Sequence, residues 1–232
     1  MQRTKVEGNV VQANLSNDHG PHASNTKFFP GARAARRKFL QFFPEGFTDE
    51  TYLAWERNYK WKAHRDWTQV LNQREMERLL ARREYTELAR RAIQIESRTN
   101  LLFSFEKMAL RDAVRSPTGA RTFATGLRDF LFEREAAALK FNRWCEVIGA
   151  LPRKQTRVLT WPLVTVFGFL ASPARHFFLK PRATLIAAEQ YGFPFEYQSR
   201  PNWDTYRSAL EFARAVRRDL SALHPQERLD IY

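Results

Sequence analysis

Apolar residues recur at helical spacing over most of the chain. Thr48 is expected to cap one helix, because acidic residues follow it and an apolar stripe then runs from Tyr52 to Val70. A short basic helix is expected between Pro30 and Pro44. Further stripes predict helices over about 73–82, about 85–115, two stretches between 117 and 149, 183–191 and about 203–223. The pattern predicts a mainly α protein, an irregular single helical domain in which 85–115 forms one long central helix.

The stretch from Val158 to Phe167 is almost continuously apolar and contains Pro162. Periodicity alone does not separate a buried strand from a buried helix here. A proline would cost a central strand one ladder hydrogen bond, whereas a helix accommodates it in its first turn. We therefore expect a buried apolar helix pair near 155–170. At most a short extended segment is expected near 193–197, where apolar and polar residues alternate.

The first 26 residues are polar and lack any hydrophobic period, which predicts a disordered tail over 1–26. Residues 27–232 are predicted to form a single helical domain, with a candidate sub-boundary near 149–152. Beyond Leu151-Pro152 the sequence becomes more apolar and richer in β-branched residues.

Composition narrows the class of protein. Hydrophobic residues make up 44% and aromatic residues 14% of the chain, too many for a disordered protein. The sequence has neither an 18-residue apolar run nor a secretory signal, so we expect no association with a membrane. Its one cysteine, Cys145, excludes an intrachain disulfide and indicates a reducing compartment, the cytoplasm. We expect Cys145 to be a buried small hydrophobe rather than a nucleophile.

Motifs for nucleotide, metal or serine-hydrolase chemistry are missing. The glycines form neither GxGxxG nor GxxxxGK[ST], no GxSxG elbow occurs, and the five histidines include no pair spaced by four. We therefore expect no cofactor and no metal.

The net charge of +13 points to a polyanionic partner. Residues 153–218 hold 11 Lys and Arg against four Asp and Glu, which is +7 of that total. The sequence favours a basic nucleic-acid-binding protein that contacts mainly the phosphate backbone, without a sequence-specific readout motif. The candidate contacts are Arg33, Arg36, Arg37, Lys38, Arg153, Lys154, Arg157, Lys180, Arg182, Arg214 and Arg218. The phenylalanines between the first four cations either stack on bases or enter the core.

Two other classes of function stay open. Glu96, Asn100, Lys107 and Arg111 share one lengthwise strip of the expected long helix, and such a strip is usually solvated or salt-bridged. If it lines a pocket, the protein is an enzyme in which Glu96 is the base and the two cations bind an anion. The third alternative is an adaptor that binds an acidic partner protein through the same basic surface.

The order of features over 151–192 resembles the helix-hairpin-helix DNA glycosylases. Leu151-Pro152, the apolar run to Phe167-Gly168 and a later helix ending at Gly192 follow in a similar sequence over about 40 residues. The resemblance would imply a DNA repair fold. However, Arg153-Lys154-Gln155 stands where the hairpin glycines of that family lie, and no aspartate occurs between Asp129 and Asp204. No site residue of the family is therefore carried over.

Overall fold

The computed structural model describes residues 29–152, 158–225 and 230. Within them the chain is helical and contains no strand, so the predicted mainly α class is confirmed. A π-helical turn, Leu53–Arg57, joins the second and third helices. The α-helices are α1 (Ala32–Phe42), α2 (Glu50–Tyr52), α3 (Asn58–Val70), α4 (Gln73–Ala81), α5 (Tyr85–Ser97), α6 (Ser104–Ala113), α7 (Pro117–Phe132), α8 (Ala137–Ala150), α9 (Trp161–Ala171), α10 (Pro181–Tyr191) and α11 (Trp203–Asp219).

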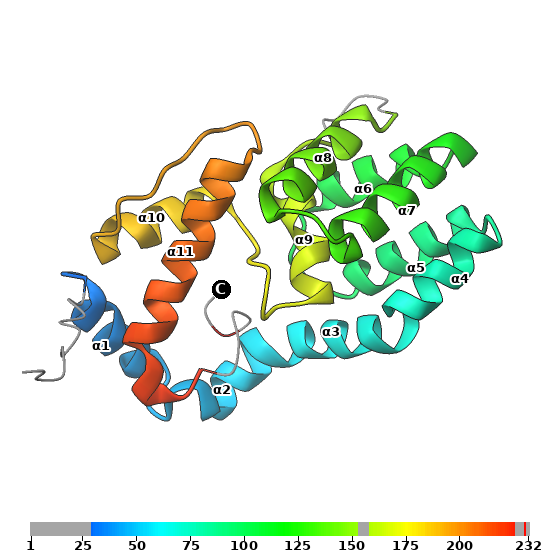
Figure 1. Cartoon of the computed structure of the whole chain (residues 1–232). Helices are drawn as coiled ribbons and strands as arrows, with labels where there is room; N and C mark the ends of the chain where they lie inside the picture. Colours follow the sequence, from blue (N-terminus) through cyan, green and yellow to red (C-terminus); the bar gives the residue numbers. More distant parts are fainter. Residues whose placement is uncertain (1–28, 153–157, 226–229, 231–232) are drawn as a thin grey trace, which may run out of the picture.

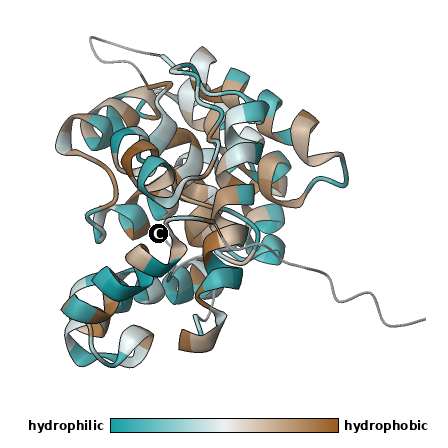
Figure 2. Cartoon of the chain, turned by 90° about the vertical axis from the view of Figure 1, so that its left-hand side faces the viewer, coloured by the Kyte–Doolittle hydropathy of each residue, from teal (hydrophilic) through white to brown (hydrophobic). Residues whose placement is uncertain are grey.

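The helices gather in two groups around α9. Figure 1 shows α1, α10 and α11 on one side and α4 to α8 on the other, with α3 running beneath α9 and the second group. Seen from the side of α1 in Figure 2, the helices carry hydrophilic and hydrophobic residues in alternation, as amphipathic helices do. One hydrophobic core draws buried residues from α3 to α9 and from α11.

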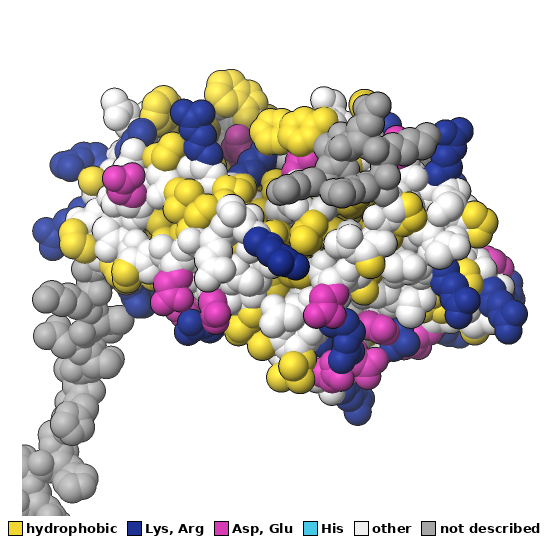
Figure 3. All heavy atoms as spheres, turned by 90° about the horizontal axis from the view of Figure 1, so that it is seen from above, with side chains coloured by type: hydrophobic (Ala, Val, Ile, Leu, Met, Phe, Trp, Pro, Cys, Tyr) yellow, Lys and Arg dark blue, Asp and Glu magenta, His cyan; other side chains and the backbone are white. Residues whose placement is uncertain are grey.

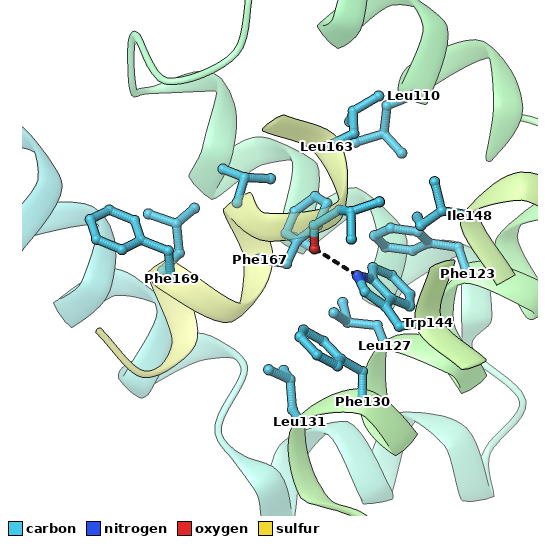
Figure 4. Close-up of a cluster of buried hydrophobic side chains, with 14 of the residues drawn as sticks. Leu110, Phe123, Leu127, Phe130, Leu131, Trp144, Ile148, Leu163, Phe167 and Phe169 are labelled. Atoms are coloured by element: carbon cyan, nitrogen blue, oxygen red, sulfur yellow. Dashed lines mark hydrogen bonds between the residues drawn. The ribbon is translucent and has the colours of Figure 1, made fainter. Parts of the chain in front are cut away.

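The centre of this core is α9, in which every residue from Trp161 to Leu170 is buried. Thr160 caps the helix by accepting a hydrogen bond from the Leu163 amide, and proline occupies the first turn, as the sequence indicates. Trp144 of α8 donates from Nε1 to the Val164 carbonyl at 2.8 Å, a bond drawn in Figure 4. The indole thereby ties α8 to the buried helix.

Among the described residues of the stretch 155–170, α9 is the one helix, so the expected helix pair is not found there. Residues 158–160 are not helical, and residues 153–157 lie outside the described part of the chain. The proline argument located the start of α9 correctly, but apolar character alone gave no evidence that the preceding residues continue a helix.

The long central helix expected over 85–115 is two helices, α5 and α6, separated by a turn. Thr99 hydrogen-bonds to the Glu96 carbonyl at 2.8 Å and closes α5. Glu106 accepts a hydrogen bond from the Phe103 amide at 3.1 Å, which satisfies a donor at the start of α6. The apolar stripe continues across the turn, so periodicity did not reveal the break.

Asp49, not Thr48, caps the helix that follows it. Its Oδ1 accepts hydrogen bonds from the amides of Thr51 at 2.9 Å and Tyr52 at 3.3 Å. Thr48 instead donates its hydroxyl proton to the Glu45 carbonyl at 2.8 Å. Both residue types are good caps, and the backbone geometry selects one of them.

The segment 193–197 is neither helix nor strand. Its backbone amides bond to hydroxyl groups of α11: Glu196 donates to Ser208 Oγ at 3.0 Å, and the following Gln198 donates to Thr205 Oγ1 at 2.9 Å. Side chains thus replace the partner strand that an alternating segment would otherwise need. The predicted disordered tail over 1–26 lies outside the described residues.

Helix α1 is held against α10 by a close backbone contact. The Gly31 amide donates to the Tyr191 carbonyl at 3.1 Å, and a Cβ at Gly31 would lie 2.0 Å from the Gln190 oxygen. Gly192, at φ +74°, turns the chain after α10 so that Pro30 packs on it. Phe29 places its ring 5.9 Å from that of Tyr191. Glycine is thus required at both turns for α1 to reach the body.

Candidate nucleic-acid interface

Helix α1 presents an exposed cationic face. Arg33, Arg36 and Arg37 are spaced so that they share one side of the helix, and all three are exposed. The opposite side, which includes Lys38 and Phe39, lines an apolar groove against α10 and α11. Within the part of the chain that the structure describes, no carboxylate lies within ion-pairing distance of the three arginines. Their charge is therefore directed to solvent.

Most cations of α4 and α5 are arranged differently, because carboxylates pair with Arg78, Arg90 and Arg91. Arg78 and Arg91 hydrogen-bond to Glu75, each at 2.7 Å, and these bonds lower the pKa of Glu75 to about 2. Hydrogen bonds from Arg90 and then Arg91 lower the pKa of Glu87 to about 2 as well. Positive charge on this face is therefore largely compensated, unlike the charge on α1.

Of the remaining predicted contacts on α10 and α11, two are exposed arginines without a described carboxylate partner, and the third pairs with a buried carboxylate. Arg182 at the start of α10 and Arg214 on α11 are exposed. Arg218 donates to Asp219 at 2.8 Å, and the same buried carboxylate accepts the Tyr191 hydroxyl at 2.8 Å. Arg218 thus compensates a buried acid. Arg153, Lys154 and Arg157 lie outside the described residues.

Lys180 lies beside an exposed pair of aromatic rings. Its ammonium is 5.6 Å from the centre of the Phe103 ring. Phe103 and Phe105 stack almost parallel, with centroids 5.6 Å apart and planes inclined by 8°. These side chains are 56% and 49% exposed. We call Phe103, Phe105 and Lys180 the aromatic platform.

Sequence reasoning missed the two phenylalanines of the aromatic platform. The apolar stripe through Leu102 and Ala109 accounts for the buried face of the expected helix, and Phe103 and Phe105 fall off it. Two closely spaced aromatic residues off the stripe, at 103 and 105, were the available signal.

The four residues of the expected enzyme pocket do not surround one cavity. Glu96 is 1% exposed and lies 3.5 Å from the Lys107 ammonium, which also donates to the Thr99 carbonyl at 2.6 Å. Burial raises the pKa of Glu96, and the ammonium opposes that rise. Asn100 is exposed, while Arg111 lines a separate surface hollow with Arg90. The Glu96–Lys107 pair closes the turn between α5 and α6.

The groove beside α1 is the other notable cavity. It has a volume of about 540 Å³ and is lined mainly by apolar side chains of α1, α10 and α11. At one end the Tyr52 hydroxyl donates to Asp230 at 2.9 Å, and Arg57 lies 3.4 Å from the same carboxylate. This buried network connects Asp230 to α2 and to the π-helical turn that follows it.

Comparisons with protein-family models, curated proteins and solved structures give no match to this chain. They therefore lend no support to the resemblance of residues 151–192 to the helix-hairpin-helix DNA glycosylases. Among the described helices, none is both long and apolar enough to cross a bilayer.

Proposed function

We propose that this chain is a nucleic-acid-binding protein whose contacts are mainly to the phosphate backbone. The observation that carries the proposal is the face formed by Arg33, Arg36 and Arg37, which is exposed and lacks carboxylate partners among the described residues. Three cations on one helical face match the repeated charges of a phosphate backbone and release counterions when they bind it. Lys180, Arg182 and Arg214 are further candidate phosphate contacts, and Lys38 is a candidate on the groove side of α1. A cytoplasmic location belongs to this proposal and rests on the single unpaired cysteine.

The alternative functions have weaker support. An enzyme built on Glu96 would need a cavity at that carboxylate, and the side chain is enclosed by the turn between α5 and α6. An adaptor for an acidic protein would use the same arginines, so a competition between nucleic acid and an acidic polypeptide separates the two proposals.

The test compares two triple variants with the same change of net charge. Arg33→Ala/Arg36→Ala/Arg37→Ala removes the proposed face. Arg65→Ala/Arg74→Ala/Arg134→Ala removes three other exposed arginines for which no carboxylate partner is described. Binding of short duplex DNA is followed by fluorescence anisotropy between about 50 and about 200 mM salt.

The α1 variant is expected to bind about tenfold more weakly or worse, with a salt slope reduced by about 2 to 3. The control variant should stay close to the wild type. Equal losses in both variants would show that net charge alone, and not this face, governs binding. An absence of binding by the wild type at about 50 mM salt would refute the proposed function.

A further inference from the structure

The rings of Phe103 and Phe105 are unusual because they are stacked in the open. Exposed single aromatic residues are common, but two parallel, stacked rings that are each about half exposed form an ordered apolar patch. Met108, 61% exposed, follows them on the same helix. Figure 3 shows hydrophobic side chains gathered in patches between Lys and Arg on the upper face of the molecule.

The backbone beneath these rings is held firmly. Glu106 is 2% exposed and accepts hydrogen bonds from the Phe103 amide at 3.1 Å and the Thr160 hydroxyl at 2.7 Å. One buried carboxylate therefore joins the start of α6 to the cap of α9. The two rings project from the first residues of this anchored turn, so their separation is fixed before any ligand binds.

Positive charge lies directly beside the rings. Lys180 has its ammonium 5.6 Å from the Phe103 ring and 5.9 Å from the buried Phe178 ring. Lys180 is also the residue that precedes α10, and Arg182 lies exposed in the first turn of that helix. The first amides of a helix favour an anion, and two cations at the same end strengthen that preference.

We propose that the aromatic platform binds the unpaired bases of a single-stranded nucleic acid. The bases stack on Phe103 and Phe105, while Lys180 contacts the adjoining phosphate. This inference rests on the proposed function and adds a substrate class to it, because stacking requires bases that are free of a duplex. Charge complementarity favours this ligand over a protein partner, since Lys180 lies against the Phe103 ring and no carboxylate among the described residues forms an ion pair with it.

The test separates bases from phosphates. An oligothymidylate and an abasic oligonucleotide of equal length carry the same charge, but only the first can stack. The wild type is expected to bind the oligothymidylate about fivefold more tightly or better. Phe103→Leu/Phe105→Leu keeps apolar side chains but removes the π faces, so it should abolish this preference and leave binding of the abasic strand unchanged. An oligouridylate arm shows whether RNA is bound as well as DNA.

Two further variants define the site. Phe42→Leu replaces another exposed phenylalanine, 66% exposed on α1, and should retain the preference. Lys180→Gln should weaken binding of both strands, because it removes a phosphate contact and no base contact. Circular dichroism of each variant confirms that the helices are retained.

The outcomes distinguish the two proposals. If the wild type binds neither strand, the proposed function fails. If it binds both strands equally well, or if the preference survives in Phe103→Leu/Phe105→Leu, backbone binding stands but the aromatic platform is not a base-stacking site. If Lys180→Gln leaves both affinities unchanged, the assignment of the phosphate contact is overturned. Quenching of 2-aminopurine placed within the strand, lost in Phe103→Leu/Phe105→Leu only, gives an independent readout of stacking.

Discussion

Glu96 carries a carboxylate into the interior at the junction of α5 and α6, where Lys107 is its ion-pair partner at 3.5 Å. Lys107→Met keeps an apolar stem but leaves the carboxylate buried without its counter-charge. Loss of one partner of a buried pair costs about 3 kcal/mol, so we expect a destabilisation of that order at neutral pH. Lys62→Met, which breaks an exposed pair with Asp66, should cost about 0.5 kcal/mol or less. Urea unfolding of both variants measures the two changes.

The same substitution has a predictable pH dependence. Burial raises the pKa of Glu96 above its ordinary value, so the folded state holds the proton more tightly than the unfolded state. The stability contributed by protonation is present at acid pH and is lost as the pH rises above 4.5, the ordinary value, towards the raised pKa. Lys107→Met raises that pKa further, so its destabilisation should be smaller at acid pH than at neutral pH. A constant difference across this range would contradict a buried charge at Glu96.

Cys145 is a second residue whose chemistry follows from burial. The thiol is 8% exposed, and burial raises its pKa to about 12, which leaves almost no thiolate at neutral pH. We expect the native protein to react with a disulfide reagent only on the timescale of unfolding, and the denatured protein to react at once. Rapid modification of the native protein would show that α8 opens readily.

At the scale of single residues, the sequence predicted correctly that an apolar side chain is buried. It did not predict which of two neighbouring residues with similar side chains makes a given contact. Cys145 was predicted to be buried and is. Thr48 and Asp49 are both good caps, and only the path of the backbone decides between them. Phe103 and Phe105 are aromatic residues outside the stripe, and nothing in the sequence states that their rings lie parallel.

At the scale of whole elements, the attachment of α1 depends on Gly31. A Cβ at this position would meet the Gln190 oxygen at 2.0 Å and the Tyr191 Cα at 2.6 Å, both of them backbone atoms. We therefore expect Gly31→Ala to separate α1 from α10, so that α1 unfolds locally and trypsin cleaves at its arginines. Gly149→Ala is the matched control, since its Cβ would have only Leu159 nearby at 3.6 Å. That change in α8 should be neutral or stabilising by up to about 1 kcal/mol.

Limited proteolysis and thermal unfolding check this prediction together. Rapid cleavage within α1 of Gly31→Ala, with the remaining fragment still folded, is the expected result. Resistance equal to that of the wild type would show that the α1–α10 junction rearranges to accept the methyl group.

The helices themselves were more predictable than the breaks between them. Stripes, prolines and Gly192 located α1, α4, α7, α8, α10 and α11, since each of these helices has an apolar face bounded by a turn signal. The break between α5 and α6 escaped detection because the buried side of both helices continues the same period. The turn is set instead by the local hydrogen bond from the Thr99 hydroxyl to the Glu96 carbonyl and by the tertiary hydrogen bond from the Thr160 hydroxyl to Glu106, and a periodic pattern contains neither.

At the scale of the whole molecule, the helices differ in how many of their residues are buried, and α9 and α1 are two extremes. α9 is buried over its first ten residues and packs in the main core, whereas α1 contributes only Ala32 as a buried residue. Amide hydrogens in α9 should therefore exchange only through global unfolding. Those in α1 should exchange through a local opening that requires less free energy. Hydrogen exchange measured by mass spectrometry should give much faster exchange for α1 than for α9. Equal rates for the two helices would mean that α1 unfolds together with the core.

The same exchange map, repeated with an oligothymidylate, locates the bound strand on the molecule. In the first turn of α10, the amides of Arg182 and Ala183 have no intrahelical acceptor and exchange readily, so a phosphate accepting from them should slow their exchange. Slower exchange is also expected in α1, which would open less often when phosphates neutralise Arg33, Arg36 and Arg37, and in residues 103–108 beneath the bases. The amides of α4 and α5 should not change, because carboxylates already hold their principal arginines. Protection centred on α4 and α5 would place the strand away from both α1 and residues 103–108, and would contradict both the α1 face and the aromatic platform.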